Sequence, residues 1–310
     1  MNKRHLTSIL AIGAAASLAL SGCATGNDVA AGGSNGGGSN GGGEGDLGTI
    51  TLGYLPSWTD GLSTAYLLED QLEKIGYTVE MQELTEAGPL YAGLAQGDVD
   101  IYPSAWPELT HKSYMDQYKD KIEDLGAYYE GAKLTIAVPD YVDIDSIEDL
   151  KANADRFGGK IYGIEPGAGL TKQTQESMIP AYGLDDSYQL VTSSTAAMLT
   201  ELDSAEAAQR DIVVTSWRPF WANDKYKLKD LEDPKGAMGE AEALHFLGTA
   251  GFAKEYPEAA ELIKGIKLDD EQYASLEDTV VNKYGEGKYP EAVDEWLKEN
   301  PDAYDTIVTD

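Results

Sequence analysis

Short apolar segments alternate with amphipathic segments along most of the chain, and this alternation restricts the fold more than any other feature. Residues 48–54 and 78–84 predict strands, and residues 63–75 between them carry apolar side chains at helical spacing. Gly76 stands where such a helix would end. A chain that alternates strands with helices packs its helices on the faces of a parallel sheet. We therefore predict an α/β fold.

The same alternation continues along the chain. Ser146, followed by Glu148 and Asp149, predicts a capped helix start. Trp296 lies between Val293 and Leu297 and is expected to pack on a helix face. The remaining expected elements are strands at 99–102, 134–138, 160–164 and 211–215, and helices at 89–96, from about 171, at 196–202 and from about 257.

The N-terminal residues predict export from the cytoplasm. Lys3 and Arg4 precede an apolar stretch at 10–20 that is too short to span a bilayer as a mature helix. The run Leu-Ser-Gly-Cys that ends at Cys23 resembles a bacterial lipobox, in which the cysteine becomes the lipid-carrying N-terminus. We predict a lipoprotein signal peptide at 1–22 and a lipid-anchored domain on the extracytoplasmic face of the cell membrane.

Residues 23–47 are rich in Gly, Ser and Asn and predict a flexible tether with a reach of roughly 25–30 Å. Cys23 is the only cysteine, so no intramolecular disulfide is possible. The formal net charge of −31 repels nucleic acid, which excludes that class of partner. The length that remains after the tether favours two lobes.

Three tryptophans lie in short polar motifs that follow strand-like runs. Trp58 lies in Pro-Ser-Trp-Thr-Asp, Trp106 in Ser-Ala-Trp-Pro, and Trp217 in Ser-Trp-Arg-Pro-Phe-Trp. We expect each on a loop at the carboxyl end of a strand, where open α/β sheets bind ligands. Three indoles that meet there predict an aromatic cage for a quaternary ammonium cation.

Several runs carry a resemblance to a known family. They are Glu-Ala-Gly-Pro at 86–89, Ser-Ala-Trp through Thr-His-Lys at 104–112, Gly-Ile-Glu-Pro-Gly-Ala-Gly at 163–169 and Thr-Ser-Trp-Arg-Pro-Phe-Trp at 215–221. With residues 226–229 and His245, they resemble the glycine-betaine and proline-betaine binding proteins of bacterial ABC importers. The resemblance covers essentially residues 48–300, and its motifs are specific only when taken together.

The resemblance implies a two-lobed periplasmic-binding-protein-like fold of type II, with the ligand in the cleft between the lobes. The first lobe would comprise residues 48–138 and 246–310, and the second residues 139–245. The hinges would lie near Val138-Pro139 and near His245 to Leu247. A ligand site divided between two lobes couples binding to closure.

The resemblance also assigns the ligand contacts. His111 and the backbone N–H groups of Gly169 and Leu170 would bind a carboxylate, while Trp58, Trp106 and Trp217 would enclose the cation. A glycine-rich turn that opens a helix exposes unpaired N–H groups at the positive end of the helix dipole, which gives the carboxylate contact a physical basis. The first lobe would supply Trp58, Trp106 and His111, and the second Gly169, Leu170 and Trp217.

Three residues depart from the family pattern. Glu165 stands where family members often have Asp, and Phe220 where they often have His. Arg218 places a positive charge beside Trp217, and we expect it to face solvent or a carboxylate such as Asp60. We expect Trp221 to support the site without touching the ligand.

Enzymatic activity is not expected. Outside the signal peptide the histidines are His111 and His245, which lie in different segments, and no metal-ligand spacing is present. No nucleophile elbow or Walker loop occurs either. We expect no cofactor and no bound metal. The expected partners are a betaine ligand, an ABC importer permease and, through Cys23, the membrane.

Other ligands and another role remain open at this stage. The cage is also suited to choline, carnitine, ectoine or a sulfonium analogue. Choline lacks a carboxylate, so it would leave buried donors unpaired at a cost of roughly 1–3 kcal/mol. A sensory lipoprotein without a transporter is a further alternative.

Overall fold

The structure, a computed structural model, describes residues 47–301. The predicted signal peptide at 1–22, the lipidation site Cys23 and the tether up to residue 46 lie outside the described residues. Within residues 47–301, no helix combines the length and the apolar character that crossing a membrane requires.

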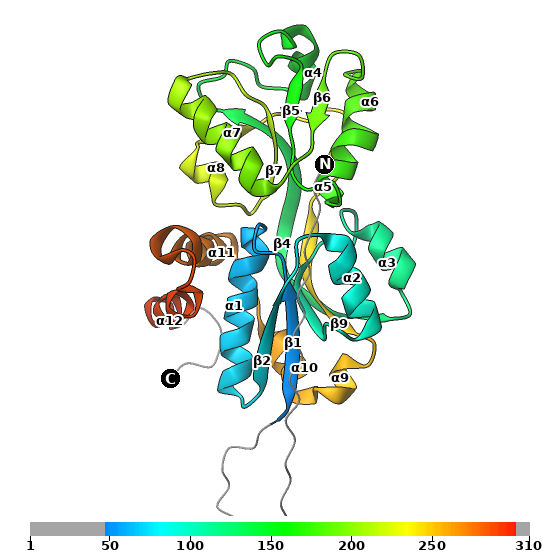
Figure 1. The fold of residues 1–310 in the computed structure, drawn as a ribbon, viewed down its shortest axis with the longest axis vertical. Helices are drawn as coiled ribbons and strands as arrows, with labels where there is room; N and C mark the ends of the chain where they lie inside the picture. The colour runs from blue at the N-terminus through cyan, green and yellow to red at the C-terminus, as the bar shows by residue number, and fades with distance from the viewer. Residues whose placement is uncertain (1–46, 302–310) are drawn as a thin grey trace, which may run out of the picture. The chain divides into compact units, whose positions relative to one another are not determined.

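The described strands form one continuous mixed sheet (Figure 1). Its strand order is β2 (Thr78–Glu83), β1 (Thr49–Tyr54), β3 (Ile101–Ala105), β9 (Glu242–Thr249), β4 (Ile122–Pro139), β7 (Val214–Arg218), β5 (Lys160–Tyr162) and β6 (Gln189–Val191), and β8 (Leu228–Asp230) pairs with β4. The pairs β1–β2, β1–β3, β5–β6 and β5–β7 are parallel, as the alternation predicts. The expectation of purely parallel sheets is wrong at the centre, where β9 runs antiparallel to β3 and β4, and β4 antiparallel to β7.

Strand β4 changes its partner along its length. Residues 122–132 pair with β9, whereas residues 133–137 pair with β7. We call the elements around β2, β1, β3 and β9 the β1 lobe, and those around β7, β5, β6 and β8 the β5 lobe. β4 changes its partner between Ala132 and Lys133, which is upstream of the predicted hinge at Val138-Pro139. The predicted boundaries of the two lobes stay a prediction.

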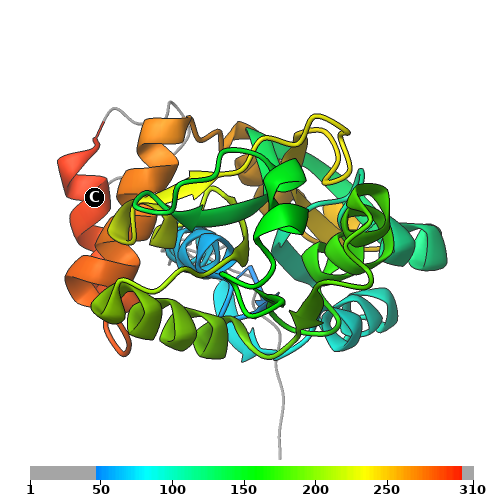
Figure 2. The ribbon, with the colours of Figure 1, turned by 90° about the horizontal axis from the view of Figure 1, so that it is seen from above.

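Helices cover the strands of both lobes (Figures 1 and 2). The β1 lobe carries α1 (Thr59–Lys74), α2 (Ala87–Gln96), α3 (Lys112–Tyr118), α9 (Phe252–Glu255), α10 (Pro257–Gly265), α11 (Asp270–Glu277), the π-helical turn Asp278–Tyr284 and α12 (Tyr289–Glu299). The β5 lobe carries α4 (Ile147–Leu150), the 3-10 turn Lys151–Asn153, α5 (Gly169–Gln173), the π-helical turn Thr174–Met178, α6 (Ile179–Tyr182), α7 (Thr195–Ala208) and α8 (Ala222–Lys225).

Local sequence signals explain several of these elements. Ser146 caps α4 with a capping box in which Asp149 bonds back to the Ser146 N–H, as the sequence predicts. In α1 the apolar side chains at 67, 68 and 72 are fully buried, which fixes the face that packs on the sheet. Trp296 is buried on α12, as expected, and its Nε1 donates to the Ser275 hydroxyl at 2.8 Å.

Candidate ligand-binding site

A pocket lies between the β1 lobe and the β5 lobe, and its lining includes all six residues that are predicted to contact the ligand. The space within it that protein atoms leave empty is about 340 Å³, including the part that is open to solvent. Its full lining is Trp58, Asp60, Trp106, Thr110, His111, Leu134, Ile164, Ala168, Gly169, Leu170 and Trp217. A small ligand in this pocket would touch both lobes.

Trp58 lies on the loop between β1 and α1, as predicted, and occupies the N-cap position of α1. Its indole is buried, and its Nε1 donates to Glu165 Oε2 of the β5 lobe at 3.1 Å. The His111 ring lies nearly parallel to the Trp58 indole, with ring centroids 5.9 Å apart. Trp58 is therefore held between the Glu165 carboxylate of the β5 lobe and the His111 imidazole of its own lobe, the β1 lobe.

Trp106 and His111 close a short turn after β3 by exchanging two hydrogen bonds. The Trp106 N–H donates to His111 Nδ1 at 3.1 Å, and the His111 N–H donates to the Trp106 carbonyl at 2.7 Å. Because Nδ1 accepts, a neutral His111 carries its proton on Nε2. Burial lowers the pKa of His111 to about 3, so the ring is neutral at physiological pH and offers one N–H donor.

Trp217 lies within strand β7, which corrects the expectation that it sits on a loop after the strand. The predicted strand at 211–215 is displaced by three residues, because Val214 to Arg218 pair with β4. Phe220 stacks on the Trp217 ring with centroids 3.9 Å apart and planes 15° apart. The Asn223 side chain donates to the Trp217 carbonyl at 2.8 Å. Phe220 thus contacts the ring of Trp217, and Asn223 holds its backbone.

Gly169 and Leu170 are the first two residues of α5, two residues before the predicted helix start at about 171. Their N–H groups have no acceptor within the helix, because the first four N–H groups of any α-helix lack one. Gly169 also lies against the β1 lobe, since a Cβ built on it would come within 2.1 Å of the Thr110 carbonyl oxygen. Only glycine fits this close approach without displacement of the chain.

Asp60 lines the pocket, and the sequence analysis misses it as a site residue. Its side chain is buried, Oδ2 accepts from the Ser104 hydroxyl at 3.2 Å, and Oδ1 lacks a hydrogen-bond partner among the described residues. Burial raises the pKa of Asp60 to about 6. Its position two residues after Trp58, in the first turn of α1, is the sequence signal that points to it.

Arg218 does not face Asp60. Its guanidinium forms a bidentate pair with Asp230, at 2.8 Å from Nε and 3.0 Å from Nη2. Arg218 thus faces a carboxylate, as expected, but that carboxylate is Asp230. Trp221 lines a separate cleft, together with Arg218 and Glu277, and is not part of the pocket lining. Among residues 47–301 no group of three or more His, Cys, Asp and Glu side chains is arranged to hold a metal ion.

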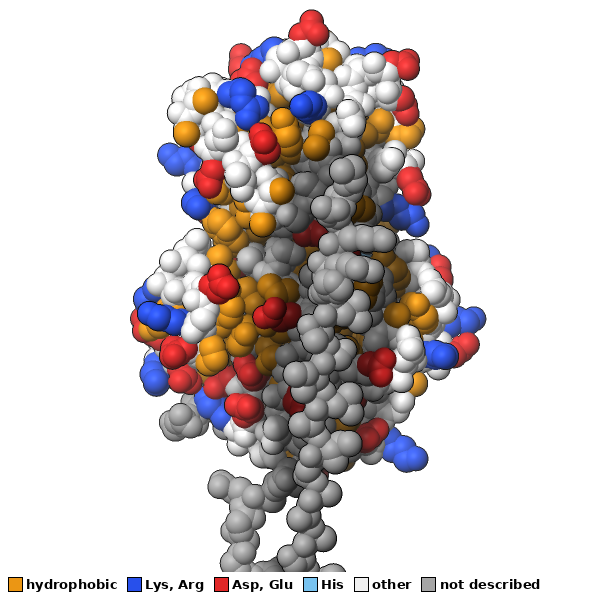
Figure 3. Space-filling model, in the orientation of Figure 1, with side chains coloured by type: hydrophobic (Ala, Val, Ile, Leu, Met, Phe, Trp, Pro, Cys, Tyr) orange, Lys and Arg blue, Asp and Glu red, His pale blue; other side chains and the backbone are white. Residues whose placement is uncertain are grey.

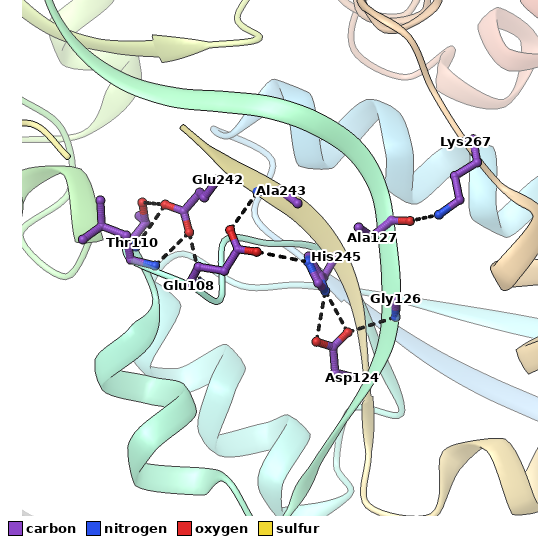
Figure 4. A network of polar contacts seen from close by, with 10 residues as sticks. Glu108, Thr110, Asp124, Gly126, Ala127, Glu242, Ala243, His245 and Lys267 are labelled. Carbon is purple, nitrogen blue, oxygen red and sulfur yellow. Dashed lines mark hydrogen bonds and ion pairs between the residues drawn. The ribbon is translucent and has the colours of Figure 1, made fainter. Parts of the chain in front are cut away.

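A network of polar contacts holds the loop that carries His111 (Figure 4). The buried carboxylate of Glu242, at the start of β9, accepts from the N–H groups of Glu108, Leu109 and Thr110 at 3.0–3.1 Å and from the Thr110 hydroxyl. In return, Glu108 accepts from the Ala243 N–H at 2.9 Å. The loop between Trp106 and His111 is thereby fixed to the strand that returns from the β5 lobe.

Comparisons with known proteins identify the family of this chain. Residues 48–299 match the family described as the substrate-binding domain of ABC-type glycine betaine transport systems, OpuAC. The glycine betaine/carnitine transport binding protein GbuC of Listeria monocytogenes is 39% identical over 159 residues, which are 51% of this chain and 51% of that protein. The matched region thus spans about half the length of this curated relative.

Two solved structures have the same fold. Lactococcal OpuAC, in its closed-liganded conformation with glycine betaine, matches with a TM-score of 0.74 and 31% identity over 82% of this chain and 96% of that chain. An ABC-transporter choline binding protein in complex with choline matches with a TM-score of 0.73 and 25% identity over 82% of this chain and 89% of that chain. The fold is the two-lobed α/β type of these binding proteins. The chain belongs to the family of substrate-binding domains of ABC-type glycine betaine transport systems.

Proposed function

We propose that this protein captures glycine betaine, or a closely related quaternary ammonium solute, and delivers it to an ABC importer for osmoprotection. The observation that carries the proposal is the pocket in which three indoles, a neutral histidine and the first turn of α5 meet from two lobes. These groups match a zwitterion, because indole faces attract a methylated cation while N–H donors bind a carboxylate. The proposal involves no chemical conversion of the ligand.

The cation end of the ligand would lie against Trp58, Trp106 and Trp217. Each desolvated cation–π contact is worth ~2 kcal/mol, so three would supply roughly 6 kcal/mol before ordering costs are subtracted. The Asp60 carboxylate lines the same pocket and adds a charge of opposite sign. Since ~6 kcal/mol corresponds only to affinities weaker than micromolar, the carboxylate end has to contribute as well.

The carboxylate end would accept hydrogen bonds from His111 Nε2–H and from the N–H groups of Gly169 and Leu170. Hydrogen bonds to a charged group contribute about 1.5–3 kcal/mol each. Because His111 and Trp106 belong to the β1 lobe, and Gly169 and Trp217 to the β5 lobe, the ligand is fully enclosed only when the lobes close. We therefore retain the predicted division into residues 48–138 with 246–310 and residues 139–245 as part of this proposal.

Substrate-binding proteins of ABC importers work on the extracytoplasmic side of the membrane. We propose that Cys23 carries a lipid there and that residues 23–47 tether the domain within reach of the importer permease. The lipobox-like run before Cys23 supports this proposal. Mass spectrometry of the protein extracted from membranes would test it, since a free, unmodified Cys23 in the mature protein would contradict the anchor.

Isothermal titration of the protein against glycine betaine, proline betaine, carnitine, choline and ectoine tests the ligand assignment. We expect glycine betaine to bind more tightly than choline. Absence of binding to every quaternary ammonium compound in the panel, by a folded protein, would reject the proposed function. Uptake of labelled betaine by cells with and without this protein distinguishes the transport role from a sensory one.

Choline is the second candidate, and Asp60 is the observation that favours it. A buried carboxylate attracts a ligand with a net positive charge more strongly than a zwitterion. Against choline stand the three N–H donors at His111, Gly169 and Leu170, which would lack a carboxylate partner. Tighter binding of choline than of glycine betaine in the titration would reverse the preference.

A further inference from the structure

The carboxylate of Glu165 connects the two lobes beside the pocket. It lies on the turn between β5 and α5 and is 4% exposed. From the β1 lobe it accepts the Ser57 hydroxyl at 3.1 Å (Oε1) and the Trp58 Nε1–H at 3.1 Å (Oε2). From its own lobe it accepts the Thr195 N–H and the Thr195 hydroxyl, each at 2.9 Å. Two donors from each lobe therefore share one buried carboxylate.

We propose that Glu165 is a positioning residue that couples lobe closure to the orientation of the Trp58 indole, and that its bonds to Ser57 and Trp58 set how long the ligand is retained. The inference rests on the proposed function, because it takes Trp58 as a wall of the ligand pocket. It assigns the residue that holds that wall to the opposite lobe.

The β5 lobe alone provides a stable place for this charge. Thr195 is the first residue of α7, so its N–H group lies at the positive end of that helix. Both Thr195 bonds lie within the β5 lobe, so movement of the β1 lobe alone would not break them. The acceptor is thus already oriented before closure, and water can replace Ser57 and Trp58 in the open arrangement.

The Trp58 indole has a single donor, and its direction is fixed by the acceptor that it meets. When Nε1 points at Glu165, the ring plane lies nearly parallel to His111 on the pocket side. Without that acceptor the indole is free to rotate about its χ angles, and the pocket loses a fixed wall. The contact between the lobes and the orientation of the Trp58 ring therefore depend on the same carboxylate.

Other residues of the same turn meet the β1 lobe through their backbone. The Tyr114 hydroxyl donates to the Gly167 carbonyl at 3.1 Å, and Gly169 lies against the Thr110 carbonyl. These two contacts do not depend on the Glu165 side chain. Substitution of Glu165 consequently leaves part of the lobe contact in place, so the effect of its carboxylate can be measured on a protein that still binds.

Stopped-flow tryptophan fluorescence with glycine betaine tests the proposal on Glu165→Gln and Ser57→Ala. Glutamine keeps the size of the side chain but turns an amide NH2 donor toward one of the groups that now donate to Glu165. We expect the dissociation rate to rise at least about tenfold for Glu165→Gln and about three- to tenfold for Ser57→Ala. The association rate should stay within about twofold, because the bonds form only after encounter. Small-angle scattering at saturating betaine should give a less compact Glu165→Gln protein than wild type.

Thr195→Val is the matched control, since it removes one bond to the same carboxylate from within the β5 lobe. Its dissociation rate should stay within about threefold of wild type. An increase as large as that of Glu165→Gln would overturn the proposal, because Glu165 would then act only through its own lobe. Unchanged dissociation in Ser57→Ala, which leaves the buried carboxylate intact, would overturn it too, even if Glu165→Gln failed to fold. Failure of the wild type to bind betaine would reject the proposed function instead.

Discussion

His111 shows how one backbone hydrogen bond fixes the chemistry of a side chain. Its Nδ1 accepts from the Trp106 N–H, so the remaining proton lies on Nε2. We predict that His111→Ala weakens glycine betaine binding by roughly 10- to 100-fold, the loss of one hydrogen bond of about 1.5–3 kcal/mol to a charged group. Choline binding should change less, because choline has no carboxylate. Titration calorimetry with both ligands measures the difference.

His245→Ala is the matched control for this prediction, since His245 is absent from the pocket lining. It bonds through Nδ1 to Asp124 at 2.8 Å, in the first part of β4, which pairs with β9 (Figure 4). Its Nε2 also approaches Glu108 of the loop that carries His111, at 3.9 Å, but the Ala243 N–H holds Glu108 as well, so the substitution should lower betaine affinity far less than His111→Ala does. Equal losses in both variants would mean that the effect arises from folding and not from the carboxylate contact.

Asp60 gives the binding a pH dependence of definite sign. Burial raises the pKa of its carboxyl to about 6 in the free protein, and a cation beside it lowers that pKa. Ligand binding therefore releases a proton from Asp60 near pH 6. We predict that affinity for glycine betaine falls as the pH is lowered from about 7 to about 5, with little change above pH 7. Titrations at several pH values in buffers of different ionisation enthalpy measure both the affinity and the proton release.

The variant Asp60→Asn separates this effect from other titrations. It should bind betaine with an affinity that is nearly constant across the same pH range. His111 does not titrate there, because burial lowers its pKa to about 3. A pH profile that is identical in Asp60→Asn and wild type would assign the titration to another group.

Trp217 tests the aromatic wall. Trp217→Ala removes a buried ring from the pocket and opens the space that Phe220 also borders, so betaine binding should weaken by at least ~2 kcal/mol. Trp221→Ala is the control, because Trp221 lines the separate cleft and should cost much less. Calorimetry and the fluorescence change on ligand addition report on both variants. Equal affinities of Trp217→Ala and wild type, with the fold intact by circular dichroism, would remove Trp217 from the site.

At the scale of elements, the turn between β5 and α5 brings two requirements together at Gly169. Gly169 lines the pocket, and a Cβ built on it would come within 2.1 Å of the Thr110 carbonyl oxygen of the other lobe. We predict that Gly169→Ala lowers betaine affinity more than tenfold, because a methyl group 2.1 Å from that oxygen forces the lobes apart. The thermal midpoint should change by only a few degrees, since the clash can be relieved by opening. Calorimetry and thermal unfolding measure the two quantities, and tight binding by the variant would contradict the contact.

Elements with one clear signal are well predicted from the sequence. β1, β2 and α1 follow their hydrophobic periodicity, and α4 begins at its capping box. The prediction stops short of the first part of β4, where Gly126 and Gly131 have positive φ and register shifts break the alternation. β9 is missed as a strand for a different reason: both its neighbours are antiparallel and far away in the chain.

The predicted site residues meet because parallel strands end at one edge of a sheet. Trp58 and Trp106 follow β1 and β3, which are neighbours, so their motifs reveal their meeting. Asp60 and Glu165 lie in or beside motifs that the sequence reveals, but residue type alone does not mark them, since the chain has 54 acidic residues. Their roles depend on burial and on partners more than 40 residues away, which no local pattern contains.

At the scale of the whole molecule, the crossing strands explain why one sheet serves two lobes. β4 pairs with β9 and then with β7, so the lobes share a continuous backbone ladder. The proposed closure of the lobes would therefore bend the shared strands and would not slide separate sheets past each other. The contacts at Glu165, Gly167 and Gly169 lie where such bending has its effect on the pocket.

We expect the net charge of the protein to change its thermal stability and not its affinity for betaine. The formal net charge is −31, and on the face drawn in Figure 3 the acidic side chains lie scattered over both lobes. Self-repulsion of this kind destabilises the compact state, and salt shortens its range from about 30 Å at 0.01 M to about 3 Å at 1 M.

We predict that the thermal midpoint rises by roughly 4–8 °C over this range of sodium chloride, equivalent to ~2 kcal/mol. Betaine affinity should stay within about twofold, because a zwitterion has no net charge for the field to attract. A midpoint that is independent of salt would mean that the carboxylates are too far apart to repel, and a steep loss of betaine affinity would mean that the ligand is recognised as a cation.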